Sequence, residues 1–160
     1  MKKFVAVLVV ACAAVFNLKA ADAFSAGVWF DIPVQVASKS IDGIGLGIPV
    51  IANAYTDGAS LALCGNNVQK MTGVQFAMFG FNYARSLEGV QIAFINMCRA
   101  QHGEFALQWG FLNQSGENGI QIGFINHGKN NASFQLGFIN INKNGLLPVM
   151  IFVNLGKDLL

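Results

Sequence analysis

A short unit without charged residues returns every 13 to 17 positions in this chain of 160 residues. Its well-formed copies read GVQIAFIN at Gly89 to Asn96, ALQWGFLN at Ala106 to Asn113, GIQIGFIN at Gly119 to Asn126 and SFQLGFIN at Ser133 to Asn140. The charged residues of this half of the chain lie between the copies. Repetition at a fixed pitch means that each copy is one structural unit that pairs with its neighbours.

Residue types alternate along each copy, as they do along an extended strand. One face is bulky and apolar and includes Phe94, Phe111, Phe124 and Phe138. The other face begins with glutamine, continues with a small residue and ends with isoleucine or leucine. Glycine and β-branched residues also oppose a helix. We predict strands with one bulky face and one narrow, partly polar face, whose glutamines are Gln75, Gln91, Gln108, Gln121 and Gln135.

Weaker copies extend this pattern in both directions and bring the number of expected strands to nine. The first and last are degenerate, as terminal repeats commonly are. In addition to the four well-formed copies, the expected strands are Val28 to Val34, Ile44 to Val50, Ala59 to Gly65, Val74 to Gly80 and Pro148 to Asn154.

The connections between copies are polar and rich in glycine and asparagine, which suit tight turns. Those at 115–118, 127–131 and 142–145 favour hairpins, and hence an all-β antiparallel meander. Such a meander most economically closes into a small β-barrel of about 8 to 10 strands, which removes exposed edges. The alternative is a parallel β-solenoid, in which the recurring Gln, Gly and Phe positions would stack into ladders. Polar connections count against it, because a coil would need apolar residues there.

In a barrel the bulky face would point outward and the glutamine face would line the lumen. Large apolar groups belong outside only where the surroundings are lipid or a partner, and alternating strands joined by turns are typical of outer-membrane barrels. The pattern therefore predicts a protein of the outer membrane or the cell surface.

The repeat resembles a family of bacterial exported proteins, the surface-repeat proteins, which are built from tandem G-[VLI]-Q-[IL]-G-[LF]-[IF]-N units. The match is good over Gly89 to Asn96, Gly119 to Asn126 and Ser133 to Asn140, fair from Ile44 onward and absent from the N-terminal segment. The resemblance implies a cell-surface or outer-membrane position and no defined activity.

The first 23 residues fit a cleaved signal peptide. Lys2 and Lys3 precede an apolar run at 4–16, and Ala21 and Ala23 supply the small residues that a signal peptidase requires. A lipoprotein box ending at Cys12 is an alternative. Residues 24–160 form the expected single β-repeat domain, in which seven Lys and Arg balance seven Asp and Glu. Because no basic excess remains, we expect no nucleic-acid partner.

No catalytic group, cofactor site or metal site emerges from the residue types. His102, His127, Cys98 and Glu104 lack the spacing of metal ligands, and loop positions explain both histidines. Cys64 and Cys98 are interpreted as small buried thiols, with a disulfide as the alternative. Asp31 is the only acid inside an expected strand, where a wet position explains it.

We therefore expect a non-enzymatic, exported protein of the outer membrane or surface, with a structural or interaction role and with membrane lipid or envelope components as partners. The alternative is a soluble periplasmic or secreted module that binds a small ligand in its glutamine-lined interior or at its rim.

Overall fold

The computed structural model describes residues 24–28, 40–99, 105–116, 118–129 and 133–159. Over these ranges it is almost entirely β-structure, with one short 3-10 helix at Lys157–Leu159. The strands are β1 (Phe24–Val28), β2 (Ser40–Ile48), β3 (Val50–Ala62), β4 (Gly65–Ala77), β5 (Phe81–Ile92), β6 (Ile95–Cys98), β7 (Phe105–Ser115), β8 (Asn118–Gly128), β9 (Ser133–Asn142) and β10 (Val149–Leu155).

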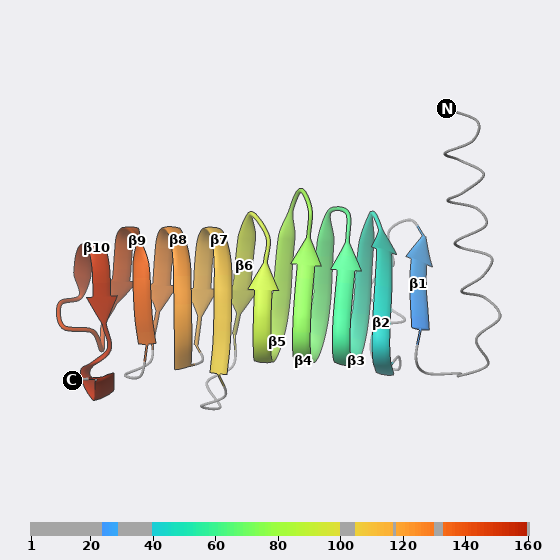
Figure 1. The fold of residues 1–160 in the computed structure, drawn as a ribbon, viewed down its shortest axis with the longest axis horizontal. Helices are drawn as coiled ribbons and strands as arrows, with labels where there is room; N and C mark the ends of the chain where they lie inside the picture. The colour runs from blue at the N-terminus through green and yellow to red at the C-terminus, as the bar shows by residue number, and fades with distance from the viewer. Residues whose placement is uncertain (1–23, 29–39, 100–104, 117, 130–132, 160) are drawn as a thin grey trace.

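The fold is a parallel β-solenoid of about six turns, and the barrel expected from the sequence is wrong. Strands β1 to β9 pair in parallel with their neighbours in chain order. The register pairs equivalent positions of successive repeats, so each glutamine lies beside that of the next coil, in the order Gln91, Gln108, Gln121 and Gln135. Figure 1 shows the coils side by side in a single row, from β1 at one end to β10 at the other.

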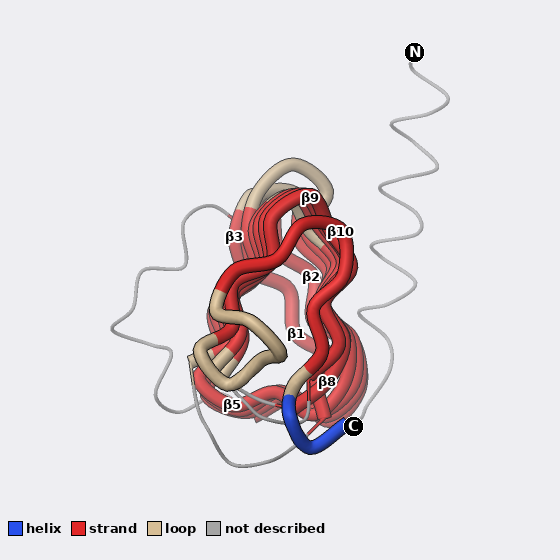
Figure 2. Tube along the Cα trace, turned by 90° about the vertical axis from the view of Figure 1, so that its left-hand side faces the viewer, coloured by secondary structure: helices blue, strands red, loops and turns tan. Residues whose placement is uncertain are grey.

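Each coil is narrow and has two legs, as the end-on view shows (Figure 2). The first leg carries the glutamine of the repeat, the chain turns at the phenylalanine, and the second leg carries the asparagine. We call the edge formed by these turns the turn edge. The opposite edge, where the chain passes to the next coil, is the loop edge. The described residues of the connections at 115–118, 127–131 and 142–145 lie there.

The repeat unit turns a corner in the middle, and this changes the alternation expected for it. Gln121 and Asn126 are both buried, whereas Phe124 is 45% exposed and Ile125 is turned outward with it. The prediction that Ile95, Leu112, Ile125 and Ile139 share the glutamine face is therefore wrong. A corner shifts the inward phase by one residue, so the asparagine takes the interior position.

Small residues make the corner possible. A Cβ added at Gly123 would lie 2.1 Å from the carbonyl oxygen of Gly110 one coil earlier, and a Cβ at Gly137 would lie 2.0 Å from that of Gly123. Real Cβ atoms do not approach backbone oxygen so closely, so these copies require glycine where the backbones of successive coils approach each other.

The polarity of the connections does not indicate hairpins here, because the strands themselves supply the side chains that fill the coil interior near the loop edge. Earlier coils place an apolar cluster there that includes Val68, Met71 and Leu87. In the column of Val68, the later coils place the small residues Ser115 and Gly128. The interior of the later coils therefore needs no large apolar residue at this column.

Among the described strands, the direction of pairing reverses only at the last one. Strand β10 runs antiparallel to β9, with a register irregularity between Met150 and Phe152, so the hairpin expected at 142–145 is confirmed. Phe152 has a φ of 68°, which is rare outside glycine. An antiparallel, irregular strand does not repeat the coil template, and it closes the C-terminal end of the solenoid (Figures 1 and 2).

Candidate interaction surface

The glutamines fill the interior of the coil and form a continuous ladder. In each glutamine from Gln91 onward, Nε2 donates to Oε1 of the glutamine one coil earlier, at 2.6 to 2.9 Å. Nε2 also donates to a backbone carbonyl on the second leg, at 3.0 to 3.4 Å. The ladder comprises Gln75, Gln91, Gln108, Gln121 and Gln135, none more than 2% exposed.

A second ladder on the other leg has the opposite polarity. In each asparagine up to Asn126, Nδ2 donates to Oδ1 of the asparagine one coil later, at 2.7 to 3.1 Å. Nδ2 also donates to a carbonyl of the next coil, at 2.9 to 3.0 Å. The residues are Asn66, Asn82, Asn96, Asn113, Asn126 and Asn140. Sequence reasoning missed this ladder, although asparagine ends every well-formed copy.

These ladders leave no lumen for the glutamines to line. Each buried amide is used to join one coil to the next, as buried polar groups require. The interior is therefore a structural core, and a surface that binds a ligand or a partner has to lie on the outside of the coil.

The turn edge carries a row of half-exposed aromatic rings, which we call the apolar ridge. Phe94, Phe111, Phe124 and Phe138 are stacked in sequence with ring centroids 5.0 Å apart and nearly parallel planes. Phe152 ends the stack edge-on at 6.4 Å. The ridge comprises Phe79, Phe94, Phe111, Phe124, Phe138 and Phe152, each 44 to 73% exposed.

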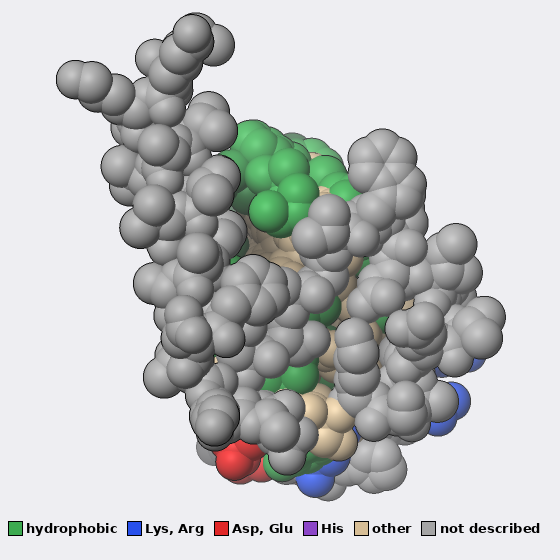
Figure 3. All heavy atoms as spheres, turned by 90° about the vertical axis from the view of Figure 1, so that its right-hand side faces the viewer, with side chains coloured by type: hydrophobic (Ala, Val, Ile, Leu, Met, Phe, Trp, Pro, Cys, Tyr) green, Lys and Arg blue, Asp and Glu red, His purple; other side chains and the backbone are tan. Residues whose placement is uncertain are grey.

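Apolar side chains also continue from the ridge onto both legs. Trp109 on the first leg is 60% exposed, and Phe81 on the second leg is 37% exposed. In a space-filling view from the β1 end, apolar side chains gather at one edge and charged ones at the opposite edge (Figure 3). The apolar surface therefore covers the turn edge and continues onto both legs, and the charged side chains lie at the other edge.

The charged side chains in the described ranges belong to the loop edge. Asp42, Asp57 and Glu88 directly precede the glycines at which earlier coils bend into their first leg. The cations lie at the other corner of this edge. Arg85, Arg99, Lys129 and Lys143 each follow a residue of one interior column, formed by Ala84, Cys98, Gly128 and Asn142.

These four cations form a row along the solenoid, which we call the cation row, and all four are exposed. Strand spacing places successive coils about 4.8 Å apart. Gly116 takes the position between Arg99 and Lys129, so those two cations are two coil spacings apart. No ion pair joins the four cations to an acid among the residues that the structure describes.

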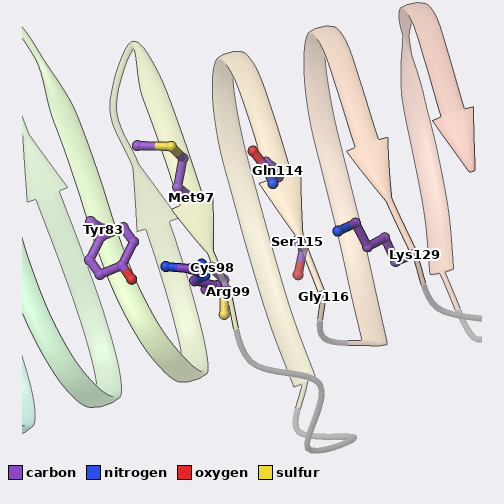
Figure 4. A pocket seen from close by; sticks show the side chains of 8 residues that line it. All are labelled: Tyr83, Met97, Cys98, Arg99, Gln114, Ser115, Gly116 and Lys129. Atoms are coloured by element: carbon purple, nitrogen blue, oxygen red, sulfur yellow. The ribbon is translucent and has the colours of Figure 1, made fainter.

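Two grooves lie along the cation row. The first, of about 380 Å³, is lined by Arg99, Gln114, Ser115, Gly116 and Lys129, with Tyr83 and Met97 beside them. Figure 4 shows Arg99 and Lys129 on coils to either side of Ser115 and Gly116. The second groove, of about 470 Å³, is lined by His127, Lys129, Lys143 and Asn144.

His127 is half-buried and belongs to β8 rather than to a loop, contrary to the interpretation from the sequence. Its pKa is lowered from the ordinary value, first by burial and then by the positive charges of Lys129 and Lys143. The positive charges of the row therefore add to the effect of burial on this imidazole.

Of the remaining residues singled out in the sequence, the structure describes Cys64 and Cys98. His102, Glu104, Asp31 and the signal-peptide segment lie outside the described residues. Within the described ranges no group of three or more His, Cys, Asp or Glu is placed to hold a metal ion. Cys64 and Cys98 form no disulfide, since Cys64 lies near the turn edge and Cys98 near the loop edge two coils away.

Comparison of the chain with protein-family models, with curated proteins and with solved structures gave no match. The resemblance to surface-repeat proteins therefore rests on the repeat unit itself. No helix in the described part of the chain is long and apolar enough to span a membrane.

Proposed function

We propose that this protein is an exported, surface-associated solenoid with a structural or interaction role, and that its apolar ridge embeds in the lipid of a cell envelope. The observation that carries the proposal is the segregation of half-exposed aromatic rings to one edge and of charged side chains to the other. The resemblance of the repeat to surface-repeat proteins supports an envelope location. No catalytic activity forms part of the proposal.

The exposed apolar surface is large enough to drive association. Burying a phenylalanine completely is worth roughly 1.5 to 3 kcal/mol, so covering the exposed half of one ring contributes about 1 kcal/mol. The six rings of the ridge together contribute on the order of 6 kcal/mol, before Trp109 and other side chains on the legs are counted. Contiguous apolar surface on this scale marks an interaction site.

The shape of this surface favours lipid over a flat protein partner. A ridge that projects from an edge and continues onto both legs, through Trp109 on one and Phe81 on the other, would be covered on one side only by a flat partner. Fluid acyl chains surround a ridge from both sides. Lipid is therefore the surrounding that buries the most of this surface.

The test is vesicle flotation combined with fluorescence of Trp109. A Trp29→Phe background makes Trp109 the single tryptophan, because the chain has two. We expect the protein to float with phosphatidylcholine vesicles, and we expect the Trp109 emission to shift to the blue and to be quenched by lipids brominated on the acyl chains. Emission that is unchanged by vesicles, with protein left in the aqueous fraction, contradicts the proposal.

A matched pair of substitutions distinguishes a contribution of the ridge to vesicle partitioning from a contribution of exposed hydrophobic residues in general. Phe124 is 45% exposed on the ridge, and Phe105 is 53% exposed at the start of β7. Phe124→Ser should weaken vesicle partitioning about fivefold, because about 1 kcal/mol of burial is lost. Phe105→Ser should leave partitioning within about twofold of the parent protein, since this ring lies outside the ridge. Equal effects would exclude the ridge as the contact.

A further inference from the structure

We infer that the cation row binds the phosphate head groups of anionic lipid while the ridge lies in the acyl region, so that the solenoid enters one leaflet only. This inference rests on the proposed function. It adds to the proposed function the class of lipid, the depth of the solenoid in the bilayer and a set of polar contacts. Embedding of the ridge alone requires none of these.

The spacing between ridge and row carries the argument. Arg99 follows Phe94 by five residues, Lys129 follows Phe124 by five, and Lys143 follows Phe138 by five. Five residues of extended strand span about 16 Å. Half of a hydrocarbon core of about 30 Å is about 15 Å. When the ridge reaches the middle of the bilayer, the row therefore lies at the level of the head groups.

The second leg between ridge and row suits this depth. Its outward side chains in successive coils include Ile95, Leu112, Ile125 and Ile139 close to the ridge. Met97 and Ile141 follow in the next outward column, together with the half-buried His127 and Gln114. The surface thus passes from apolar to mixed to cationic with increasing distance from the ridge, as the interior of a leaflet passes to its interface.

The gap at Gly116 supplies a place for a phosphate. Arg99 and Lys129 lie one coil to each side of Gly116, and Ser115 and Gln114 line the same groove of about 380 Å³ (Figure 4). Guanidinium and ammonium groups about 10 Å apart can both reach toward one phosphate between them. The acids nearest in sequence, Glu104 and Glu117, lie outside the described residues, so the experiment has to measure the net effect of the row.

The other flank of the loop edge is acidic in the N-terminal half, where Asp42, Asp57 and Glu88 lie. The row lies in the C-terminal half, from β5 to the end of β9. The inferred contact with anionic lipid is therefore local to one side of the solenoid, and it does not depend on the net charge of the whole chain.

The experiment compares partitioning into phosphatidylcholine vesicles with partitioning into vesicles that also contain phosphatidylglycerol. Protein recovered after export is used for every variant, and its N-terminus is checked by mass spectrometry. We expect the parent protein to prefer the anionic vesicles and to lose that preference as salt rises. A cation near an anionic surface contributes about fivefold to partitioning, so Arg99→Gln with Lys129→Gln should reduce anionic binding about 25-fold.

The matched control removes two cations that are outside the row, with Lys70→Gln and Lys157→Gln. It should change anionic binding less than about threefold, because these residues lie off the row. Neither pair should change partitioning into phosphatidylcholine. Both pairs replace exposed side chains, and unchanged circular dichroism will confirm that each variant folds.

The outcomes separate this inference from the proposed function. Equal losses of anionic binding in the two pairs would mean a diffuse effect of charge, and this would overturn the cation row as the site of contact. Equal binding of the parent protein to both vesicle types would overturn the inference and leave the ridge intact, whereas no binding to either would overturn both. Inorganic phosphate, added at constant ionic strength, tests for a soluble anion, and competition by it would overturn the assignment to a lipid surface.

Discussion

Nε2 of Gln108 donates to Oε1 of Gln91 at 2.7 Å, while Oε1 of Gln108 accepts from Nε2 of Gln121 at 2.9 Å. Gln108 is thus the middle residue of a ladder in which each glutamine between the two ends both donates and accepts a hydrogen bond. Oε1 of Gln135, at the C-terminal end, is buried and has no partner among the described residues. The ladder is therefore complete within the solenoid and incomplete at its end.

Replacing Gln108 with leucine should destabilise the solenoid by about 2 to 4 kcal/mol, because two ladder bonds are lost and Oε1 of Gln91 is left buried without a donor. Gln135→Leu is the matched control and should cost less, since it breaks one ladder bond and removes an oxygen that already lacks a partner. Thermal unfolding followed by circular dichroism measures the ranking. A larger loss for Gln135→Leu would contradict the ladder as the source of stability.

Gln108→Glu should make stability depend on pH. A carboxylate cannot donate to Gln91, and its burial disfavours the charged form, so the pKa of the new carboxyl should rise in the folded state. The folded protein then binds the proton more tightly than the unfolded chain, and stability should increase as the pH falls from 7 toward 4. Unfolding midpoints across this range, compared with the parent protein, provide the measurement. A flat difference between the two would show that the carboxyl is hydrated.

Gly123→Ala should destabilise the fold by several kcal/mol, because the added Cβ would meet the backbone oxygen of Gly110 at 2.1 Å and force adjacent coils apart. The matched control is Gly128→Ala, whose Cβ would meet the movable end of the Gln135 side chain at 3.0 Å. Urea unfolding of both variants tests the difference. Similar midpoints would mean that the corner has room that this structure does not show.

Acidification should destabilise the protein through His127. Its pKa is lowered in the folded state by burial and by Lys129 and Lys143, so the unfolded chain takes up the proton first and stability falls as the pH drops below the ordinary pKa of about 6.5. Lys143→Gln should raise the pKa of His127 toward that value. Titration of the imidazole signals by NMR, with His102→Gln to assign them, measures the shift. A pKa unmoved by Lys143→Gln would contradict the contribution of the row.

Removal of β10 should make the solenoid associate end to end. Truncation after Asn142 leaves the parallel edge of β9 open, with Gln135, Phe138 and Asn140 in the repeat positions, and open strand edges recruit further strands. Sedimentation velocity and thioflavin T fluorescence should report larger, β-rich assemblies than those of the full chain. If the truncated chain sediments as the full chain does, then β10 is not a cap.

The sequence predicted several features of the fold correctly. The charge-free copies with alternating residue types indicated strands, and Phe94, Phe111, Phe124 and Phe138 do lie on the outer surface. The recurrence of Gln, Gly and Phe at fixed positions favours a solenoid, whereas the polarity of the connections favours hairpins. The recurrence is the correct signal, because small residues such as Ser115 and Gly128 complete the interior where the connections begin.

The surface could be predicted only in part. The ridge follows from the phenylalanine of each copy, but the cation row does not, because Arg99 and Lys129 are 30 residues apart in the sequence, and Lys129 and Lys143 are 14 apart. Their alignment depends on connections of different length between copies. Only the register, through the column that contains Cys98, Gly128 and Asn142, brings them to one edge.

The sequence by itself determined that the repeats are extended, which side of the first leg turns inward and that the phenylalanines turn outward. Those features depend on the identity of each side chain and on the two-residue period of a strand. Tertiary structure alone decided that neighbouring strands are parallel, that each copy turns a corner and that Asn126 lies inside with Gln121. The two-residue period of a strand determines which side each residue faces, but it contains no information about the direction of the neighbouring strand.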